Sequence, residues 1–309
     1  MTWTSSTHGL PGVFVSFEGG EGVGKTTQIR FMESVLKKAG LDVVRLREPG
    51  GTSVGESLRS IVLDAKNDRL DDRAELYIYE AARAQIVAEV IRPALERGAV
   101  VLCDRFVDST VAYQGYGRGL DPAFVQHANE FACQGILPDV TVLLTVDSTA
   151  KGLRRATRRL GADRLELAGT EFHQRVNEGF RQIAAEHPER IHVVASTSTK
   201  SAAARAVWGV VGEVLHEAFG VEPPTEADYA RLDKPRRRSG GRAGSGSRSG
   251  SGSRGGSGSR SGSGSRTDAG PRGGGRQRDG RRRENSAQEG QRRGGSSRGG
   301  VSHGGAPRG

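Results

Sequence analysis

The sequence predicts an α/β protein in which a five-stranded parallel sheet carries helices on both faces. Apolar runs of strand length recur along the chain with helical patterns between them, and several runs are apolar at successive positions, as strands covered on both faces are. The predicted strands are Val13–Glu18, Val43–Arg47, Ala99–Cys103, Val140–Val146 and Ile191–Val194. Such sheets bind ligands beyond the carboxyl ends of their strands, so the segments that follow the strands are the candidate site.

Composition limits the folded part to about 220 of the 309 residues. From Val221 onward there are 20 Lys and Arg against 8 Asp and Glu, a net +12, which leaves residues 1–220 at −2 because the whole chain is +10. The same stretch holds 24 of the 46 glycines, and no aromatic residue follows Tyr229, so it cannot bury enough apolar surface to offset chain entropy. We predict a flexible N-terminus over residues 1–11, one domain over residues 12–220 and a disordered basic Gly/Ser/Arg-rich tail over residues 221–309.

The same survey favours a cytoplasmic protein. No run of 18 apolar residues is present, and Met1–Gly12 lacks a basic region followed by an apolar stretch, which argues against a membrane span and a secretory signal. The two cysteines, Cys103 and Cys133, lie in an apolar run and a helical stretch. They are interpreted as core residues and argue against a disulfide framework or a metal cluster.

The first predicted strand leads into a phosphate-binding loop. Residues 19–27 match the pattern G-x-x-x-x-G-K-[ST], and helical residues follow. Backbone N–H groups of such a loop converge on the phosphates of ATP, Lys25 reaches the β and γ oxygens, and the Thr26 hydroxyl can ligate Mg²⁺. The residues predicted to bind ATP are Gly19, Gly20, Glu21, Gly22, Val23, Gly24, Lys25, Thr26 and Thr27. No N-K-x-D segment is present, which weakens a GTPase interpretation.

Charged and polar residues follow the second and third predicted strands. Arg47 precedes a Pro-Gly-Gly turn and suits an acceptor phosphate, although turn and helix-cap chemistry explains that segment equally well. Asp104 and Arg105 end the third strand and would serve a metal-bound water and a phosphate, with a solvated ion pair as the alternative. Gln114 offers a donor and an acceptor to a nucleobase edge, whereas Tyr113 could equally be a packed turn residue.

A helix predicted over residues 72–96 places an arginine within an apolar stripe. Its members at 3-4-3-4 spacing are Leu76, Tyr79, Arg83, Ile86 and Val90. Burying an unpaired guanidinium is costly, so Arg83 is expected to meet a ligand or a carboxylate, and Tyr79 one turn earlier could stack on a planar ring. The alternative is an internal salt bridge beside a core tyrosine.

The segment after the fourth strand is rich in arginine. It contains Arg154, Arg155, Arg158, Arg159 and Arg164. The phosphate loop has no arginine, and a mobile flap carrying these residues would supply positive charge to the γ-phosphate. A solvated helix face is the plainer explanation.

Together these segments resemble the thymidylate kinases, which phosphorylate dTMP to dTDP with ATP. The resemblance covers Gly12–Phe219 and rests on four motifs in order. These are residues 19–27, Arg47-Glu-Pro-Gly-Gly-Thr52, Asp104-Arg-Phe106 with Ala112-Tyr-Gln-Gly115, and Asp163-Arg-Leu-Glu166. Three positions depart from the family's usual residues: Tyr79 stands where Phe is common, Phe106 where Tyr is usual, and Thr145 where an acid is frequent.

The resemblance implies a role for each candidate residue. On the sugar, Glu21 would contact the 3′-hydroxyl and Tyr113 would disfavour a ribose 2′-hydroxyl. Arg47 and Arg105 would hold the acceptor phosphate. Tyr79 would stack on thymine, and the polar edge of the base would be met by Arg83, Thr110 and Gln114. Lys25, Arg105, Arg159 and Arg164 would be catalytic, and Thr26 with Asp104 would hold Mg²⁺. The resemblance also implies a homodimer.

Two other functions stay open. The chain could be a P-loop kinase for another nucleotide or a deoxynucleoside, although two arginines at the acceptor site favour a monophosphate. It could instead be a nucleic-acid-binding protein working through its tail, whose spread arginines would give weak, salt-sensitive polyanion binding. The tail has no aromatic residues to stack on bases, which argues against specific recognition.

Overall fold

The computed structural model describes residues 6–146, 163–196 and 198–234. Its strands form one parallel sheet in the order β2-β3-β1-β4-β5. The bounds are β1 (Val13–Glu18), β2 (Val43–Arg47), β3 (Val100–Asp104), β4 (Val140–Thr145) and β5 (Ile191–Ala195). The predicted fold class is confirmed, and each predicted strand is correct to within one residue at either end.

Strand register brings the predicted site segments to one edge of the sheet. Phe17 of β1 and Arg47 of β2 both pair with Asp104 of β3, and all the strands run in the same direction. The phosphate loop, the turn after β2 and the segment after β3 therefore leave the sheet side by side, as the carboxyl ends of parallel strands must.

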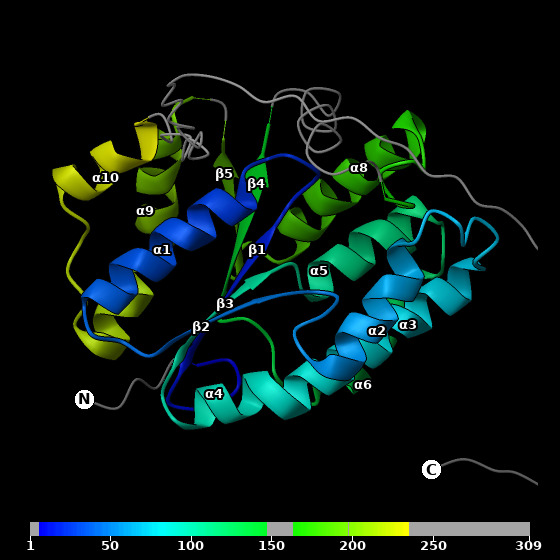
Figure 1. Ribbon diagram of the computed structural model, residues 1–309, viewed down its shortest axis with the longest axis horizontal. Helices are drawn as coiled ribbons and strands as arrows, with labels where there is room; N and C mark the ends of the chain where they lie inside the picture. The colour runs from blue at the N-terminus through cyan, green and yellow to red at the C-terminus, as the bar shows by residue number, and fades with distance from the viewer. Residues whose placement is uncertain (1–5, 147–162, 197, 235–309) are drawn as a thin grey trace, which may run out of the picture. The chain divides into compact units, whose positions relative to one another are not determined.

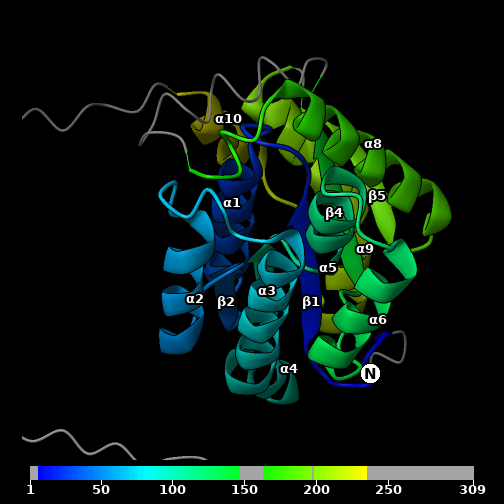
Figure 2. The ribbon, with the colours of Figure 1, turned by 90° about the vertical axis from the view of Figure 1, so that its right-hand side faces the viewer.

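Helices cover both faces of this sheet. Figure 1 shows one layer on the left and the other on the right, and in Figure 2 α3, α4 and α6 stand in front of β1. The first layer contains α1 (Lys25–Lys38), α9 (Lys200–Phe219) and α10 (Glu226–Asp233). The second contains α2 (Ser53–Leu63), α3 (Asp72–Ile86), α4 (Arg92–Glu96), α5 (Val107–Thr110), α6 (Pro122–Cys133) and α8 (Thr170–Glu186). In the described ranges no helix is long and apolar enough to cross a membrane.

Apolar faces of these helices fill the space against the sheet. Ile29 and Met32 of α1 and Val207 of α9 pack with the strands on one face. On the other face, Ile86 and Phe106 share a cluster with buried residues of β1 and β3. The near-continuous apolar runs of the strands thus meet a core on both sides, as the sequence pattern predicted.

The helix predicted over residues 72–96 changes its hydrogen-bonding pattern part-way. It is α3 followed by a π-helical turn, Val87–Ile91, and then α4, with Pro93 in the first turn of α4. A second π-helical segment, Val111–Gly117, carries Tyr113 and Gln114. π-Helical turns are rare in proteins, and those that occur are often found at functional sites.

The N-terminal residues that the structure describes contact the folded domain, within the stretch of residues 1–11 for which the sequence predicts flexibility. The backbone N–H of Thr7 donates to Oδ1 of Asp139 at 3.0 Å, and Nε2 of His8 lies 3.1 Å from Oδ2. The same carboxylate accepts the N–H of Phe14 at 2.7 Å. One buried aspartate, distant in sequence, therefore fixes the entry to β1, and composition alone gives no sign of it.

The folded unit also extends beyond the predicted boundary at residue 220. Residues 221–225 lead into α10, whose Tyr229 is buried against the ring of Phe31 in α1, with ring centroids 5.4 Å apart. The guanidinium of Arg205 in α9 lies 4.0 Å from the centre of the Tyr229 ring. The first part of the predicted tail is thus a helix docked on the first layer, and the disorder predicted for residues 235–309 lies outside the described residues.

Removing α10 is expected to destabilise the domain. A chain that ends at Gly220 loses the buried Tyr229, and deletion of a buried aromatic side chain typically costs about 3 kcal/mol or more of unfolding free energy. Urea denaturation of chains ending at Gly220 and at Lys234 measures this difference directly. The longer chain should match the full-length protein, and equal midpoints for the two truncated chains would refute a stabilising role for α10.

Candidate active site

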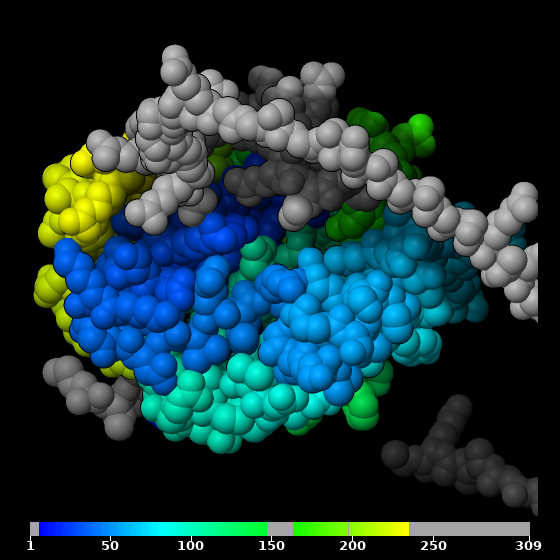
Figure 3. Space-filling view, in the orientation of Figure 1, coloured from blue at the N-terminus to red at the C-terminus, as the bar shows by residue number. Residues whose placement is uncertain are grey.

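A cavity of about 1170 Å³ lies at the carboxyl edge of the sheet. Its walls come from the loops after β1, β2, β3 and β5, from α3 and from residues 163–166. Figure 3 shows the surface hollowed between the dark blue residues of α1 and the light blue residues of α2. A cavity this size exceeds what one small ligand needs and has room for two nucleotides.

The phosphate loop is shaped by glycine. Gly19 has φ +123°, and a Cβ there would lie 2.2 Å from the carbonyl oxygen of Leu144 in β4. Gly24 is left-handed and caps α1 without a side-chain hydrogen bond, which leaves the first N–H groups of the helix for an anion. The Lys25 ammonium donates to the carbonyl oxygens of Gly19 at 2.9 Å and Gly20 at 3.0 Å, inside the loop that it is predicted to serve.

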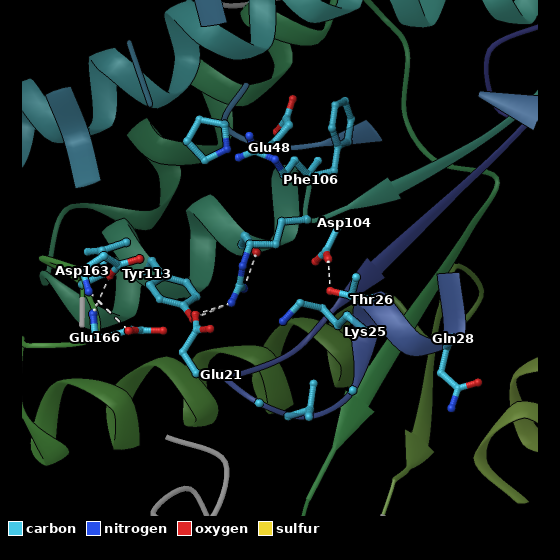
Figure 4. Close-up of a pocket in the computed structure, with 18 of the residues that line it drawn as sticks. Glu21, Lys25, Thr26, Gln28, Glu48, Asp104, Phe106, Tyr113, Asp163 and Glu166 are labelled. Atoms are coloured by element: carbon cyan, nitrogen blue, oxygen red, sulfur yellow. Dashed lines mark hydrogen bonds and ion pairs between the residues drawn. The ribbon is translucent and has the colours of Figure 1, made fainter. Parts of the chain in front are cut away.

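Two oxygen-bearing side chains meet beside this loop. Thr26 Oγ1 donates to Asp104 Oδ2 at 3.1 Å, and Figure 4 shows both directed toward the same space as Lys25. A hydroxyl and a carboxylate suit Mg²⁺, which usually takes one or two protein ligands and completes its shell with phosphate and water oxygens. No cluster of three or more His, Cys, Asp or Glu side chains arranged for a metal occurs in the described part of the chain. The donor set therefore fits Mg²⁺ better than a metal held by protein ligands alone.

Arg105 has a left-handed backbone conformation, with φ +73°, which residues other than glycine rarely adopt. The adjacent N–H, that of Phe106, donates to Glu18 Oε1 at 2.6 Å, and the Ser109 hydroxyl donates to Oε2 at 2.5 Å. Burial raises the pKa of Glu18 to about 7, and the nearby charge of Asp108 adds to the effect. This buried carboxyl group at the end of β1 holds the turn that aims Arg105 into the cavity.

The side chains of Arg105, Glu21 and Tyr113 are all hydrogen-bonded to one another. Its Nη2 donates to Glu21 Oε1 at 2.5 Å and lies 3.0 Å from the Tyr113 hydroxyl, which donates to the same carboxylate oxygen at 2.9 Å. Burial acts to raise the pKa of Glu21, but the charges of Arg105 and Lys25 outweigh it and lower that pKa to about 2. Glu21 is therefore an ionised hydrogen-bond acceptor that the phosphate loop itself presents to the cavity (Figure 4).

Arg47 lies at the mouth of the same cavity. Its guanidinium is 46% exposed and donates to Glu56 at 2.9 Å, so an entering anion can reach it. Arg59 of α2 lines the cavity next to it and donates to the carbonyl oxygen of Pro49 at 2.9 Å. The end of β2 and helix α2 thus present two guanidinium groups to the cavity where the sequence predicted one.

Arg83 meets carboxylates, one of the two alternatives that the sequence left open. Nε and Nη2 donate to Glu48, Nη1 donates to Glu80 and Asn129, and Nη2 also donates to Thr110 Oγ1 at 2.9 Å. These bonds use all five N–H groups of the guanidinium. Because Thr110 accepts from Arg83, its own hydroxyl hydrogen stays available to a ligand in the cavity.

Tyr79, Thr110 and Gln114 also line the cavity, away from the phosphate loop in sequence. Tyr79 is partly buried and presents a flat ring, and burial raises the pKa of its hydroxyl above the usual range. Gln114 is buried and its Nε2 donates to Glu75 at 2.6 Å. One aromatic face and two polar groups at its edge make a site for a planar heterocycle.

Two arginines of the predicted flap, Arg159 and Arg164, are expected to be catalytic, and the structure describes only Arg164. Arg159 lies outside the described residues. Arg164 is described, but it does not line the cavity, because its guanidinium donates to Glu75 and to the carbonyl oxygen of Val62. The structure therefore differs from the prediction for Arg164, whose charge is paired with a buried carboxylate that sequence reasoning did not single out.

Comparison with known proteins identifies the family. The sequence model of thymidylate kinase matches residues 17–206. A thymidylate kinase of Solidesulfovibrio magneticus is 53% identical over 210 residues, which cover 66% of this chain and the whole of that protein. The chain belongs to the thymidylate kinase family. Enzymes of this family phosphorylate dTMP to dTDP with ATP as the phosphoryl donor, and the predicted resemblance is confirmed.

Other thymidylate kinases match over the same part of the chain. That of Gloeobacter violaceus is 47% identical over 206 residues, covering 66% of this chain and 97% of its own length. The crystal structure of thymidylate kinase from Ehrlichia chaffeensis has a TM-score of 0.54 and 34% identity, covering 65% of this chain and 98% of that one. These matches leave about a third of the chain without a counterpart.

Several lining residues of this thymidylate kinase site were missed by sequence reasoning. Asp163 and Glu166 cap each other's backbone N–H groups beside the cavity, and their motif was noticed without a role. The segment after β5 also lines it, next to the phosphate loop. The carboxyl-edge rule could have found that segment, since it applies to the fifth strand as it does to the first three. The residues concerned are Arg59, Asp163, Glu166, Ser196, Ser198, Thr199 and Lys200.

Proposed function

We propose that this protein performs the phosphorylation of dTMP with two nucleotides bound end to end in the cavity. The observation that carries the proposal is that one cavity is lined both by the phosphate loop and by Tyr79, Thr110 and Gln114. Arg105 contacts Gly19 of the loop and Tyr113, the residue before Gln114. The ATP phosphates lie on Gly19–Thr27. The thymine lies beside Tyr79, so that the acceptor phosphate meets the γ-phosphate beside Arg105.

The acceptor is held along its whole length. Arg47 and Arg105 bind its phosphate, and Tyr79 stacks on the base. Glu21, ionised and supported by Tyr113, accepts the sugar 3′-hydroxyl, and the Tyr113 ring fills the space where a ribose 2′-hydroxyl would lie. This assignment is supported by the lowered pKa of Glu21 and by its hydrogen bonds at 2.5 and 2.9 Å to Arg105 and Tyr113.

Arg83 acts behind the base and not on it. Its five N–H groups are engaged, so it orients Thr110, whose hydroxyl donates to an oxygen of the base edge. Arg164 likewise acts through Glu75, as a positioning residue in place of the catalytic one that the resemblance implies. Arg159 remains our candidate for contact with the transferring phosphoryl group.

Positioning and charge neutralisation supply the chemistry. Thr26 and Asp104 would hold Mg²⁺, which when bound draws charge from the phosphate oxygens. Lys25 and Arg105 bring two anions into line and stabilise the charge that develops on the transferring group, and no covalent intermediate is needed. The arginine-rich flap predicted from the sequence, of which residues 147–162 lie outside the described part of the chain, would exclude water, which otherwise competes with dTMP for the phosphoryl group.

An ADP-release assay on the full-length chain tests this function. Mg-ATP is offered with dTMP, dUMP, dCMP, dGMP, AMP and thymidine in turn. We expect kcat/KM to be highest for dTMP and thymidine to be inactive, because the uncharged nucleoside gives Arg47 and Arg105 nothing to bind. A preference for another monophosphate would discard the base assignment, and turnover of thymidine would discard the phosphate assignment.

The homodimer and the weak binding of polyanions by the tail stay predictions. Sedimentation velocity tests the first, and a gel shift at physiological salt tests the second.

A further inference from the structure

Glu75 is a buried carboxylate behind the cavity wall where the base is proposed to bind, in contact with the lining residue Gln114. It lies in α3 one turn before Tyr79, and its side chain is fully buried. It accepts hydrogen bonds from three side chains of two distant segments, namely Gln114, Arg118 and Arg164. Burial of a carboxylate is tolerable here because two guanidinium groups balance its charge.

The contact with Gln114 fixes which end of that amide faces a ligand. Nε2 of Gln114 lies 2.6 Å from Oε1 of Glu75. A flipped amide would place its carbonyl oxygen against a carboxylate oxygen, two acceptors with no proton between them. Glu75 therefore holds the donor end of Gln114, and the acceptor Oε1 is the end left for a ligand.

A fixed acceptor distinguishes bases by their hydrogens. The Watson–Crick edge of thymine carries a ring N–H, which an acceptor binds, whereas cytosine presents an unprotonated ring nitrogen at that position, which an acceptor repels. On the same edge, the Thr110 hydroxyl is free to donate, which suits the exocyclic oxygen of thymine and not the amino group of cytosine. Mismatched polar groups in a buried site are costly, so one oriented amide can separate the two bases.

We propose that Glu75 is a specificity-determining positioning residue, which selects a pyrimidine with a ring N–H by holding Gln114 with its carbonyl oxygen toward the base. The inference rests on the proposed function of this site. Arg118 and Arg164 hold Glu75 in turn. Because Arg164 is the last arginine of the arginine-rich segment, that residue of the segment and the base pocket share one carboxylate.

The test compares dTMP with 5-methyl-dCMP, which differ only on the edge in question. Full-length wild type, Glu75→Gln, Gln114→Ala and the double variant are assayed for kcat/KM with each acceptor. We expect wild type to prefer dTMP, and Glu75→Gln to lower that preference about tenfold or more, because the Gln114 amide is then free to turn. In the Gln114→Ala background, Glu75→Gln should change the preference by no more than about twofold, since Glu75 acts through Gln114.

Glu89→Gln is the matched control. Glu89 also accepts a hydrogen bond from a glutamine amide, that of Gln85 at 2.8 Å, but it is exposed and does not line the cavity, so the preference should stay within about twofold of wild type. If Glu75→Gln does not fold by circular dichroism, Glu75→Gln combined with Arg118→Met removes one charge of each sign. Gln114→Ala must lower the preference in every case.

The outcomes separate this inference from the proposed function. Wild type that fails to phosphorylate dTMP refutes the function. Wild type that prefers dTMP, with Glu75→Gln retaining that preference, leaves the function intact and overturns the role of Glu75. An equal effect of Glu75→Gln with and without Gln114 would also overturn it, because the carboxylate would then act by another route.

Discussion

Replacing Lys25 by alanine is expected to lower kcat for phosphoryl transfer about 10³-fold or more. The Lys25 ammonium is buried in the phosphate loop, within 3.0 Å of two backbone carbonyl oxygens, where it can exchange those partners for the β and γ oxygens of ATP. Removing one preorganised charge from a transition state of this kind costs two to three orders of magnitude at least. Steady-state kinetics with saturating Mg-ATP and dTMP measure the loss.

Lys37→Ala provides the control on the same helix. Lys37 is exposed and pairs with Glu33 at 2.8 Å, far from the cavity, so its loss should leave kcat unchanged. Thermal unfolding of both variants separates lost chemistry from lost structure. A Lys25→Ala enzyme with near-normal kcat and normal stability would contradict the phosphate-loop mechanism.

The second large effect is expected for Arg105→Met, with kcat/KM for dTMP falling about 10²–10³-fold. Arg105 contacts the phosphate loop through the carbonyl oxygen of Gly19, and it also contacts Glu21 and Tyr113 on the acceptor side. Its loss removes charge from the acceptor phosphate and leaves Glu21 without its main partner. Most of the effect should appear in kcat/KM for dTMP, with a smaller change in KM for ATP.

The same variant should gain a dependence on pH. In wild type the pKa of Glu21 is about 2, so this carboxylate is ionised at every pH above that value. Without the Arg105 charge, burial raises the pKa of Glu21, and kcat/KM should fall as the pH drops through the raised value. Arg97→Met, which breaks an exposed pair with Asp42, is the matched control and should follow the wild-type profile. Equal profiles for all three enzymes would refute the coupling of Arg105 to Glu21.

Much of the fold could be predicted because its signals are local. The strand runs, the glycine pattern before Lys25 and the helical stripe around Tyr79 each lie within a short stretch of chain, so composition and periodicity suffice. The direction of the strands follows from the helical segments between them. Since parallel strands end at one edge, the meeting of the phosphate loop with Asp104 could also be predicted.

The end of the domain was predicted too early because the composition of the tail outweighed the local sequence pattern of the short helix α10. The glycine and arginine content after residue 234 dominates the tail's average, and α10 is only eight residues long. Its local signs were present, since Thr225 and Asp228 form a capping box and Tyr229 is the last aromatic residue of the chain. A single buried tyrosine then decided the matter through contacts with α1 and α9.

The sequence by itself determined the sheet, the phosphate loop and the arginines that a phosphoryl transfer requires. Only the tertiary structure decided which charges pair. Arg83 joins Glu48 from 35 positions away, and Arg164 joins Glu75 from 89 positions away. The physical reason is that burial makes each guanidinium seek a carboxylate, but the packing of α3 against the loops selects which carboxylate is within reach.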